Sequence, residues 1–505
     1  MWPRFHRHDL GVIAHYLGTL VILLGVIMLV PLIISCALQE WETTPHYLIG
    51  FGLALAAGSL LRLARVSPAV LERRQAIAVT GLAWLVGALV ASVPLWLSGH
   101  YGSFFDAFFD GVSGLTATGL TLIQDLDHLS TADNMWRFAL QFLGGQGVVV
   151  IALSLGLFSK VGSSFYNAEG RDEFILPNIK KTAQFIWQFS SVVVLIGTVI
   201  LTISALLLGI EPVRSVFHGL WITIGAYDTG GFTPQSTNIV YYHSWAFEII
   251  TMLLMLMGAI NFAVYAQAWK SGWRVLFKDI EIRTLAIWIT FLVVVFTAAL
   301  CAGQYLTDIN GLLRRGIFTI VSAATNSGYQ VISTNQLTAM LTTGAFFMIA
   351  IAMAVGGSAG STAGGIKALR VGLIAKGIIA RVKGVLSPSS AHITASYHHV
   401  GRRLLSNELL SSAMIIASLY VVSYLVGALA GIAYGYEAIP ATFESISAAS
   451  NAGMSSGIAA PDAPVFIKIT YIIQMWTGRL EFLTLLALLA SFIASLRPRK
   501  RGVKA

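Results

Sequence analysis

Long stretches of apolar residues recur along this chain from residue 10 to residue 495. A helix that crosses a lipid bilayer needs about 20 apolar residues. Of the 505 residues, 56% are hydrophobic and only 11% are charged, whereas roughly 25% charged residues is usual in a soluble domain. The sequence therefore predicts an all-α integral membrane protein without a soluble domain. Ten spans are predicted, of which the eighth is interrupted: 10–38, 45–64, 75–98, 134–158, 184–210, 242–269, 283–303, 340–380, 409–433 and 465–495.

Basic residues lie beside the ends of these spans instead of forming one patch, although the net charge is +9. If the N-terminus is cytoplasmic, all the basic clusters fall in cytoplasmic loops, as the positive-inside rule requires. Both termini are therefore expected in the cytoplasm, and topology explains the charge better than binding of nucleic acid does. The clusters are Arg4/Arg7, Arg62/Arg65/Arg73/Arg74, Lys160/Arg171/Lys180/Lys181, Lys270/Arg274/Lys278/Arg283, Arg370/Lys376/Arg381/Lys383, Arg402/Arg403 and Arg497/Arg499/Lys500/Arg501/Lys504.

The loops on the opposite side carry an excess of acidic residues. Such a face would form a vestibule that concentrates cations through a potential that falls off over roughly 8 Å at physiological salt. An ordinary solvated loop surface would explain the same residues, so both interpretations stay open. The acidic residues are Asp106, Asp110, Asp125, Asp127, Asp133, Glu211, Asp228, Asp308, Glu437, Glu444 and Asp462.

Four of the outer loops share one pattern that ends in glycine. Each begins with an aromatic residue, becomes rich in small and hydroxyl side chains, and reaches the glycine ten positions after the aromatic residue. A predicted span precedes and follows each loop, so the chain contains four units of helix, re-entrant loop and helix. The aromatic and glycine pairs are Phe109/Gly119, Trp221/Gly231, Phe318/Gly328 and Phe443/Gly453.

These four loops predict a pore. Non-helical backbone at membrane depth is tolerated only inside protein or beside a water-filled cavity. Glycine permits backbone angles at which carbonyl groups turn to the pore axis and replace the hydration shell of a cation. Close packing of helices at small residues is the alternative explanation of the glycines. The candidate filter residues are Thr116, Thr118, Gly119, Gly230, Gly231, Thr325, Asn326, Ser327, Gly328, Asn451, Ala452 and Gly453.

Two further features lie inside predicted spans. A glycine-rich segment, residues 356–365, must interrupt the eighth span, because each glycine costs roughly 1 kcal/mol relative to alanine in a helix. A hinge or a close-packed crossing would also explain it, and Lys367 just after it could serve only as a topology determinant. Arg479 lies well inside the last span, where burial costs several kcal/mol unless the charge is paired; a local pair with Glu481 is the alternative to a functional role. The glycines of the segment are Gly356, Gly357, Gly360, Gly364 and Gly365.

In these motifs the sequence resembles the Trk/Ktr/HKT superfamily of cation transporters, and within it the bacterial TrkH type, over nearly the whole chain. The two spans ahead of residue 75 resemble the additional N-terminal pair of the TrkH type, which the eight-span KtrB type lacks. The matching stretches are RRQAIAVTGLAWLVGALVASVPLWLSG (73–99), FFDAFFDGVSGLTATGLT (104–121), MWRFALQFLGGQGVVVIAL (135–153), TGGFTPQS (229–236), INFAVY (260–265), GGSAGSTAGGIK (356–367) and MWTGRLEFLTLLALL (475–489).

The resemblance implies four concatenated helix–pore-loop–helix repeats around one pore, preceded by two extra N-terminal transmembrane helices. It also implies a homodimer with one pore per subunit in the bacterial cytoplasmic (inner) membrane, with a cytoplasmic TrkA-like nucleotide-binding ring as partner. The implied division is 1–72 for the two N-terminal helices, 73–160 for repeat 1, 161–270 for repeat 2, 271–385 for repeat 3 with its gating loop, and 386–505 for repeat 4 with a basic C-terminal tail.

The function that the resemblance implies is uptake of potassium through a channel-like, selective pore. Potassium is then the ion bound in the filter, and no organic cofactor is expected. Glycine rather than serine at the first filter position goes with potassium preference in plant relatives, although Asp228 leaves the contribution of the second loop open. The segment 356–365 corresponds to the intramembrane loop that gates the pore, and Arg479 to a positive charge below the filter.

Other functions stay open from the sequence. A potassium/sodium or potassium/proton symporter, or a less selective monovalent cation channel, would carry the same motifs. An alternating-access transporter built from inverted repeats is disfavoured, because each repeat begins and ends inside and the repeats are therefore parallel. An intramembrane enzyme would need a nucleophile and base or a metal cluster in the spans. The histidines show no metal-ligand spacing, and His398 and His399 are expected on a solvated surface.

Overall fold

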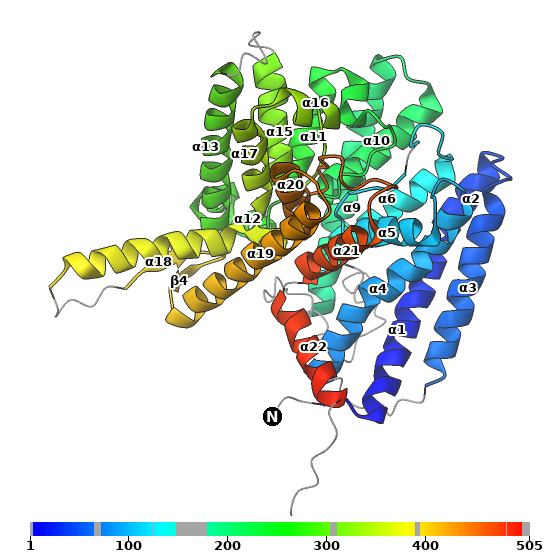
Figure 1. Ribbon diagram of the computed structural model, residues 1–505, viewed down its shortest axis with the longest axis horizontal. Coiled ribbons are helices and arrows are strands. Elements are labelled where there is room, and N and C mark those ends of the chain that lie inside the picture. Colours follow the sequence, from blue (N-terminus) through cyan, green and yellow to red (C-terminus); the bar gives the residue numbers. More distant parts are fainter. Residues whose placement is uncertain are drawn as a thin grey trace, which may run out of the picture.

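The computed structural model describes residues 4–64, 72–123, 125–147, 179–302, 311–388, 394–480 and 482–496. Within these ranges the chain is predominantly helical (Figure 1). Some of the predicted features lie outside the described residues. They are the second part of the span 134–158, the boundary between repeats 1 and 2, Glu481 and the basic C-terminal tail.

Two helical segments precede the first repeat. Helix α1 (Arg7–Ile27) leads into α2 (Leu29–Ala37), and α3 (Thr44–Arg62) packs along α1. A Cβ added to Gly58 of α3 would lie only 2.8 Å from the backbone oxygen of Gly18 in α1. Small residues at such contacts let membrane helices approach closely. Both α1 and α3 also pack on α4 (Arg73–Leu97), the first helix of repeat 1, as expected for the N-terminal pair.

A short pore helix follows the first long helix of each repeat. The pore helices are α5 (Phe104–Leu115), α10 (Pro212–Tyr227), α15 (Ile317–Ala324) and α20 (Ala438–Ala449). The helices before them are α4 (Arg73–Leu97), α9 (Ile179–Leu207), α13 (Ile280–Ala302) and α19 (Asn407–Ala433). The helices after them are α6 (Thr131–Gln146), α11 (Trp245–Gly258), α17 (Thr343–Ala354) and α21 (Val465–Leu480). Shorter connecting elements are η1 (Asn238–Tyr242), η2 (Trp273–Lys278), η3 (Leu312–Gly316) and α16 (Thr334–Met340).

The four units close into a ring. The helix after each pore loop packs on the pore helix of the next unit: α6 on α10, α11 on α15, α17 on α20, and α21 on α5. The last of these contacts joins the fourth unit to the first. Ion pairs also cross unit boundaries, among them Arg314–Glu248 at 2.5 Å and Lys468–Asp106 at 2.6 Å. The arrangement places the four pore loops at the centre of one ring.

Several predicted spans are broken in the structure. Helix α11 meets α12 (Phe262–Ser271) at 92°, and α21 meets α22 (Phe482–Leu496) at 111°, so the spans 242–269 and 465–495 are not straight helices. At the first break, the side chain of Asn261 caps α12 by accepting the backbone N–H of Ala263 at 2.8 Å. Among the described residues, six helices are long and apolar enough to cross a membrane, or up to 8 with each bent pair counted once. Ten spans were expected.

Two pairs of short strands qualify the expectation of an all-helical chain. Strand β1 (Val355–Gly356) pairs in parallel with β2 (Ile366–Lys367) and closes the glycine-rich segment, which leads into α18 (Ala368–Leu386). Strand β3 (Ser396–His398) pairs antiparallel with β4 (Arg402–Leu404) between α18 and α19. Figure 1 shows α18 projecting to one side, with this hairpin beside it.

Large apolar side chains cover the outward faces of the long helices. Leu195 of α9, Ile287 of α13 and Leu425 of α19 are 65%, 70% and 56% exposed. An exposed apolar surface of this extent is unfavourable in water but suits a lipid environment. Together with the spanning helices, it makes the chain a multi-pass membrane protein.

Candidate ion pathway

The four pore loops turn in the same way. Each pore helix ends with a residue in a left-handed backbone conformation, and the next residue donates its N–H to a carbonyl five positions earlier, as in a Schellman helix cap. The left-handed residues are Ala117, Thr229, Asn326 and Asn451, with φ of 51°, 50°, 55° and 52°. The hydrogen bonds are Thr118 to Ser113 at 2.8 Å, and Gly230 to Gly225, Ser327 to Ser322 and Ala452 to Ser447, each at 2.9 Å.

The four candidate filter glycines follow these turns and lie against one another. Their φ values are 101° for Gly119, 71° for Gly231, 79° for Gly328 and 81° for Gly453. A Cβ on any of them would collide with the backbone oxygen of the residue that precedes the glycine in the next loop. Backbone angle and space therefore both require glycine. The contacts close in a cycle, which is Gly119 with Gly230, Gly231 with Ser327, Gly328 with Ala452, and Gly453 with Thr118.

Side chains of the candidate filter residues hold the loops in place. Asn326 Nδ2 donates to the carbonyl of Met353 at 2.8 Å, and Asn451 Nδ2 donates to that of Met475 at 2.9 Å. Asn451 also donates to the hydroxyl of Thr118 in the first loop at 2.9 Å, which links the fourth repeat to the first. The amides therefore brace the third and fourth loops against the helices that follow them. Hydroxyl pairs within single loops are Thr116–Thr118 at 2.7 Å and Thr325–Ser327 at 2.9 Å.

Buried acids brace the first and fourth loops. Asp110 and Glu444 each lie nine positions before the filter glycine of their loop. Asp110 Oδ1 accepts the backbone N–H of Leu122 at 2.7 Å, and Glu444 Oε2 accepts that of Ser456 at 2.6 Å. Both N–H groups lie three positions after the glycine, so the two repeats use the same brace. Sequence reasoning missed this role because the two acids were grouped with the outer loops.

The interpretation of an acidic outer surface is therefore wrong for part of its residues. Five of the acids are buried. Each of them accepts hydrogen bonds or forms an ion pair inside the protein, which offsets the cost of burying it. They are Asp106, Asp110, Asp133, Asp228 and Glu444. Five others are exposed, and Asp308 lies outside the described residues. The exposed acids are Asp125, Asp127, Glu211, Glu437 and Asp462.

Polar side chains of α6 support the second loop, which departs most from the others. Gln141 donates to the carbonyl of Gly230 and accepts the N–H of Phe232 at 3.3 Å. Gln146 Nε2 donates to the carboxylate of the fully buried Asp228 at 2.7 Å. The sequence contained a signal for both glutamines, since polar side chains inside a predicted span are usually functional.

The glycine-rich segment packs directly on the pore loops. Thr362 Oγ1 donates to the carbonyls of Tyr227 and Gly258 at 3.0 and 2.9 Å, and the hydroxyl of Thr229 lies 3.3 Å from it. A Cβ on Gly364 would collide with the backbone oxygen of Ser450 in the fourth loop. The segment therefore contacts loops from opposite parts of the sequence.

Arg479 connects this segment to the first repeat. Its Nη1 donates to the carbonyl of Thr362 at 2.8 Å, and its Nη2 donates to the carbonyls of Gly144 and Gly145, the latter at 3.0 Å. The guanidinium carbon lies 5.7 Å from the centre of the Trp84 ring. The partly buried charge is thus offset by carbonyl dipoles and an aromatic face.

Comparison with known proteins assigns the family. The family model described as TrkH, cation transport protein, matches residues 44–495. The chain belongs to the TrkH family of cation transport proteins. It is accordingly a transporter and not an enzyme.

Individual relatives match along nearly their whole length. An uncharacterized cation transporter of Methanocaldococcus jannaschii is 29% identical over 99% of both chains. The Trk system potassium uptake protein TrkH of Halomonas elongata is 28% identical over 95% of this chain and 98% of its own. The crystal structure of the potassium transporter TrkH from Vibrio parahaemolyticus superposes with a TM-score of 0.81 at 25% identity, and it covers 98% of this chain and 100% of that chain.

Lys367 lies at the end of the glycine-rich segment of this TrkH-family chain. It is half-buried, and its Nζ donates to the carbonyl of Ala363. This hydrogen bond closes the end of the segment on itself. The sequence did not predict the contact, and it left open whether Lys367 serves only as a topology determinant.

His399 is not on a solvated surface, as the sequence analysis expected. Its side chain is 1% exposed, and its Nδ1 lies 3.1 Å from Asp279 Oδ2. The fold buries this histidine because the β3–β4 hairpin turns back onto the start of α13. Spacing along the sequence therefore did not reveal that Asp279 and Glu281 lie beside His399.

Proposed function

We propose that this chain takes up potassium through a channel-like, potassium-selective pore. The observation that carries the proposal is the cyclic contact of Gly119, Gly231, Gly328 and Gly453. Four loops from distant parts of the sequence form one ring of left-handed glycine backbone, as expected for a filter in which backbone carbonyls replace the hydration shell of a cation. The pore helices end at this ring, and helix C-termini carry partial negative charge that favours a cation.

Potassium is the ion favoured by the relatives and by the filter. The related proteins of Halomonas elongata and Escherichia coli are named Trk system potassium uptake proteins. All four filter positions are glycine in this chain. A membrane potential that is negative inside would drive potassium inward through such a pore, at about 2.3 kcal/mol per charge for each 100 mV.

The glycine-rich segment and Arg479 form the proposed gate. The segment contacts the second and fourth pore loops, and Arg479 holds it through the carbonyl of Thr362. In this arrangement a positive charge lies beside the segment that would have to move for an ion to pass. Opening would require the loop to leave the guanidinium, and the remaining charge would oppose a cation in a medium of reduced dielectric constant.

The proposal includes a homodimer in the bacterial cytoplasmic membrane, with both termini in the cytoplasm and a TrkA-like nucleotide-binding ring below. Apolar side chains on the projecting helix α18 support a contact with a second copy or with lipid. The most exposed of them are Ile378, Val385 and Leu386, at 60%, 84% and 81%. The basic residues of the same helix, Lys376, Arg381 and Lys383, agree with a cytoplasmic location.

Flux from liposomes that contain only the purified chain tests the function. A potassium gradient alone should drive charge movement, and the reversal potential in mixed potassium and sodium should follow potassium. The Gly328→Ala variant should lose this flux. The matched control is Gly344→Ala, because a Cβ at Gly344 meets no atom within 4 Å. Flux that does not depend on the potassium gradient would contradict the proposal.

A potassium/sodium or potassium/proton symporter is the second candidate, and the same liposomes decide between the two. In a symporter, a gradient of sodium or protons moves the reversal potential at fixed potassium. In a pore, the reversal potential stays where the potassium gradient sets it.

A further inference from the structure

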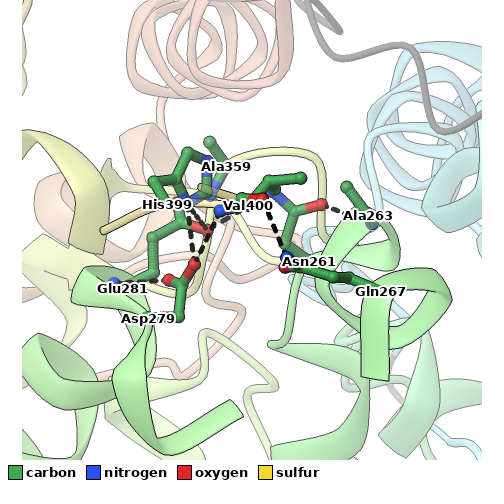
Figure 2. Close-up of polar contacts among 8 residues, drawn as sticks. All are labelled: Asn261, Ala263, Gln267, Asp279, Glu281, Ala359, His399 and Val400. Atoms are coloured by element: carbon green, nitrogen blue, oxygen red, sulfur yellow. Dashed lines mark hydrogen bonds and ion pairs between the residues drawn. The ribbon is translucent and has the colours of Figure 1, made fainter. Parts of the chain in front are cut away.

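Three side chains of types that bind metal ions converge at the start of α13 (Figure 2). They are Asp279, Glu281 and His399. The imidazole Nδ1 lies 3.1 Å from Asp279 Oδ2 and 3.7 Å from Glu281 Oε2, and the three ligand atoms all lie within 4.8 Å of one another. None of the three side chains is more than 1% exposed. The proposed ion pathway gives these three side chains no role.

The spacing fits one metal ion. Nitrogen and carboxylate ligands lie about 2.1 Å from a zinc ion, so two ligands at tetrahedral or octahedral angles are roughly 3.0–3.4 Å apart. A small rotation of the Glu281 carboxylate would bring its 3.7 Å separation into this range. By themselves, two carboxylates and one imidazole sum to a negative charge whether or not the ring is protonated, which suits a dication as ligand. The imidazole favours a transition-metal ion over Ca²⁺ or Mg²⁺, which prefer oxygen ligands.

Neighbouring groups orient the ligands, as in metal sites whose outer partners fix each ligand. Asp279 Oδ1 accepts the N–H of Glu281 at 2.8 Å, and Glu281 Oε2 accepts Nδ2 of Asn261 at 3.3 Å. Asp279 Oδ2 accepts the N–H of Val400 at 3.3 Å. Val400 has a φ of 55°, which is unfavourable for a β-branched residue. Gln267 donates to its carbonyl at 2.8 Å and helps to hold this turn.

The cluster also touches the glycine-rich segment. Glu281 Oε1 accepts the N–H of Ala359 at 2.6 Å, so one carboxylate contacts the segment with one oxygen and the imidazole with the other (Figure 2). An ion bound by Glu281 would therefore fix the position of the segment.

We propose that Asp279, Glu281 and His399 bind one divalent transition-metal ion, such as Zn²⁺ or Co²⁺, and that the bound ion holds the glycine-rich segment in the position seen here. The binding site stands independently of the proposed function. The effect on the segment rests on its proposed role as the gate.

Metal binding by the purified full chain tests the site directly. The chain, freed of any histidine tag and treated with a chelator, is dialysed against Zn²⁺ or Co²⁺ in detergent, and bound metal is measured by mass spectrometry. We expect one ion per chain, affinity that rises from Mn²⁺ to Co²⁺ to Ni²⁺, and no displacement by Mg²⁺ or Ca²⁺. Bound Co²⁺ should also show a visible absorption band. Absence of saturable binding overturns the site.

Substitutions show which residues hold the ion. His399→Ala should weaken binding roughly tenfold or more, whereas His398→Ala, its neighbour in the hairpin, should bind as the parent does. Asp279→Asn and Glu281→Gln keep the side-chain shape and should weaken metal binding similarly. If His399→Ala fails to fold, these two variants still test whether the three residues bind the ion. Equal binding by the parent and these variants would mean that the three residues form only an ion pair.

Flux in the liposomes tests the link to the gate. Saturating Zn²⁺ should lower potassium flux of the parent about fivefold or more, the size of a usual coupling between sites, and should leave Glu281→Gln unaffected. If Zn²⁺ binds but flux does not change, the link to the gate is wrong and the site stands. If Zn²⁺ binds and no condition gives flux, the proposed function fails and the site again stands.

Discussion

Individual residues of the proposed filter are fixed by contacts that cross the ring. Each filter glycine combines a positive φ with a neighbouring carbonyl that leaves no room for a Cβ. A side chain at one position must therefore displace the backbone of the adjacent loop. The effect of such a substitution should reach beyond its own repeat.

Replacement of the first filter glycine should reduce the preference for potassium. The Cβ of Gly119→Ser would press on the carbonyl of Gly230 and distort the ring that replaces the hydration shell. We expect the potassium to sodium permeability ratio to fall about tenfold, which corresponds to ~1.4 kcal/mol. Reversal potentials under mixed-ion conditions measure it, with Gly344→Ala as control. A ratio equal to the parent's would remove Gly119 from the filter.

Arg479 allows charge and tethering to be separated. Arg479→Ala removes both the positive charge and the hydrogen bonds to Thr362 and to the end of α6, so basal flux should rise. Arg479→Lys keeps the charge but lacks the planar fork that serves several carbonyls at once. Low flux in the lysine variant would show that the positive charge is the barrier. High flux would show that the hydrogen bonds of the guanidinium group keep the pore closed.

Thermal unfolding of the same reconstituted samples is the control for Arg479. A variant that unfolds early and conducts less than the parent would make Arg479 a structural residue. Arg402→Ala, which changes an exposed residue of the hairpin, should leave both flux and stability unchanged.

Among the elements, the glycine-rich segment differs from the helices on either side of it in the contacts that it makes. It breaks the second helix of the third repeat, is closed by the β1–β2 pair, and rests on the end of α10 and on the fourth pore loop. In the second and fourth repeats, by contrast, the two helices of the bent pair are separated by at most 4 residues. The third repeat thus differs from its neighbours at the level where a gate is expected.

Loosening the segment should raise basal flux. Thr362→Val removes the hydroxyl that bonds to Tyr227 and Gly258, and shortening residues 356–365 should act in the same direction. Uptake by potassium-deprived cells and liposome flux both measure the effect. Thr470→Val is the matched control, since the hydroxyl of Thr470 donates to Phe466 within its own helix. Unchanged flux in a well-folded shortened chain would make the segment a packing element.

At the scale of the whole molecule, the ring depends on the contact between its first and last units. Helix α21 packs on α5, and Lys468 forms a buried ion pair with Asp106 across 362 positions of sequence. Lys468 Nζ also donates to the carbonyl of Pro461 at 2.7 Å. This junction holds together two segments that lie far apart in the sequence.

Breaking that junction should destabilise the fold. Lys468→Met leaves the buried carboxylate of Asp106 without its cation, which costs roughly 3–5 kcal/mol. The double variant Asp106→Asn/Lys468→Met leaves no buried charge and should recover much of the loss. Thermal unfolding in detergent measures both. If the single and double variants unfold at the same temperature, the ion pair does not stabilise the ring.

The sequence by itself determined the membrane character, the four-fold pattern and which four glycines meet in the ring. Apolar length and a glycine ten positions after an aromatic residue are local features, and each can be read without knowing its neighbours in space. The motifs of the glycine-rich segment and of Arg479 were visible for the same reason.

Only the tertiary structure decided which polar groups meet. Asp110 and Glu444 became braces because their pore helices bring them back to the segment after the filter. The carbonyl partners of Arg479 lie 117 or more positions away, and His399 lies 120 positions from Asp279. Such pairings depend on how the repeats and the hairpin pack. A local sequence pattern does not show which distant segment will pack against it.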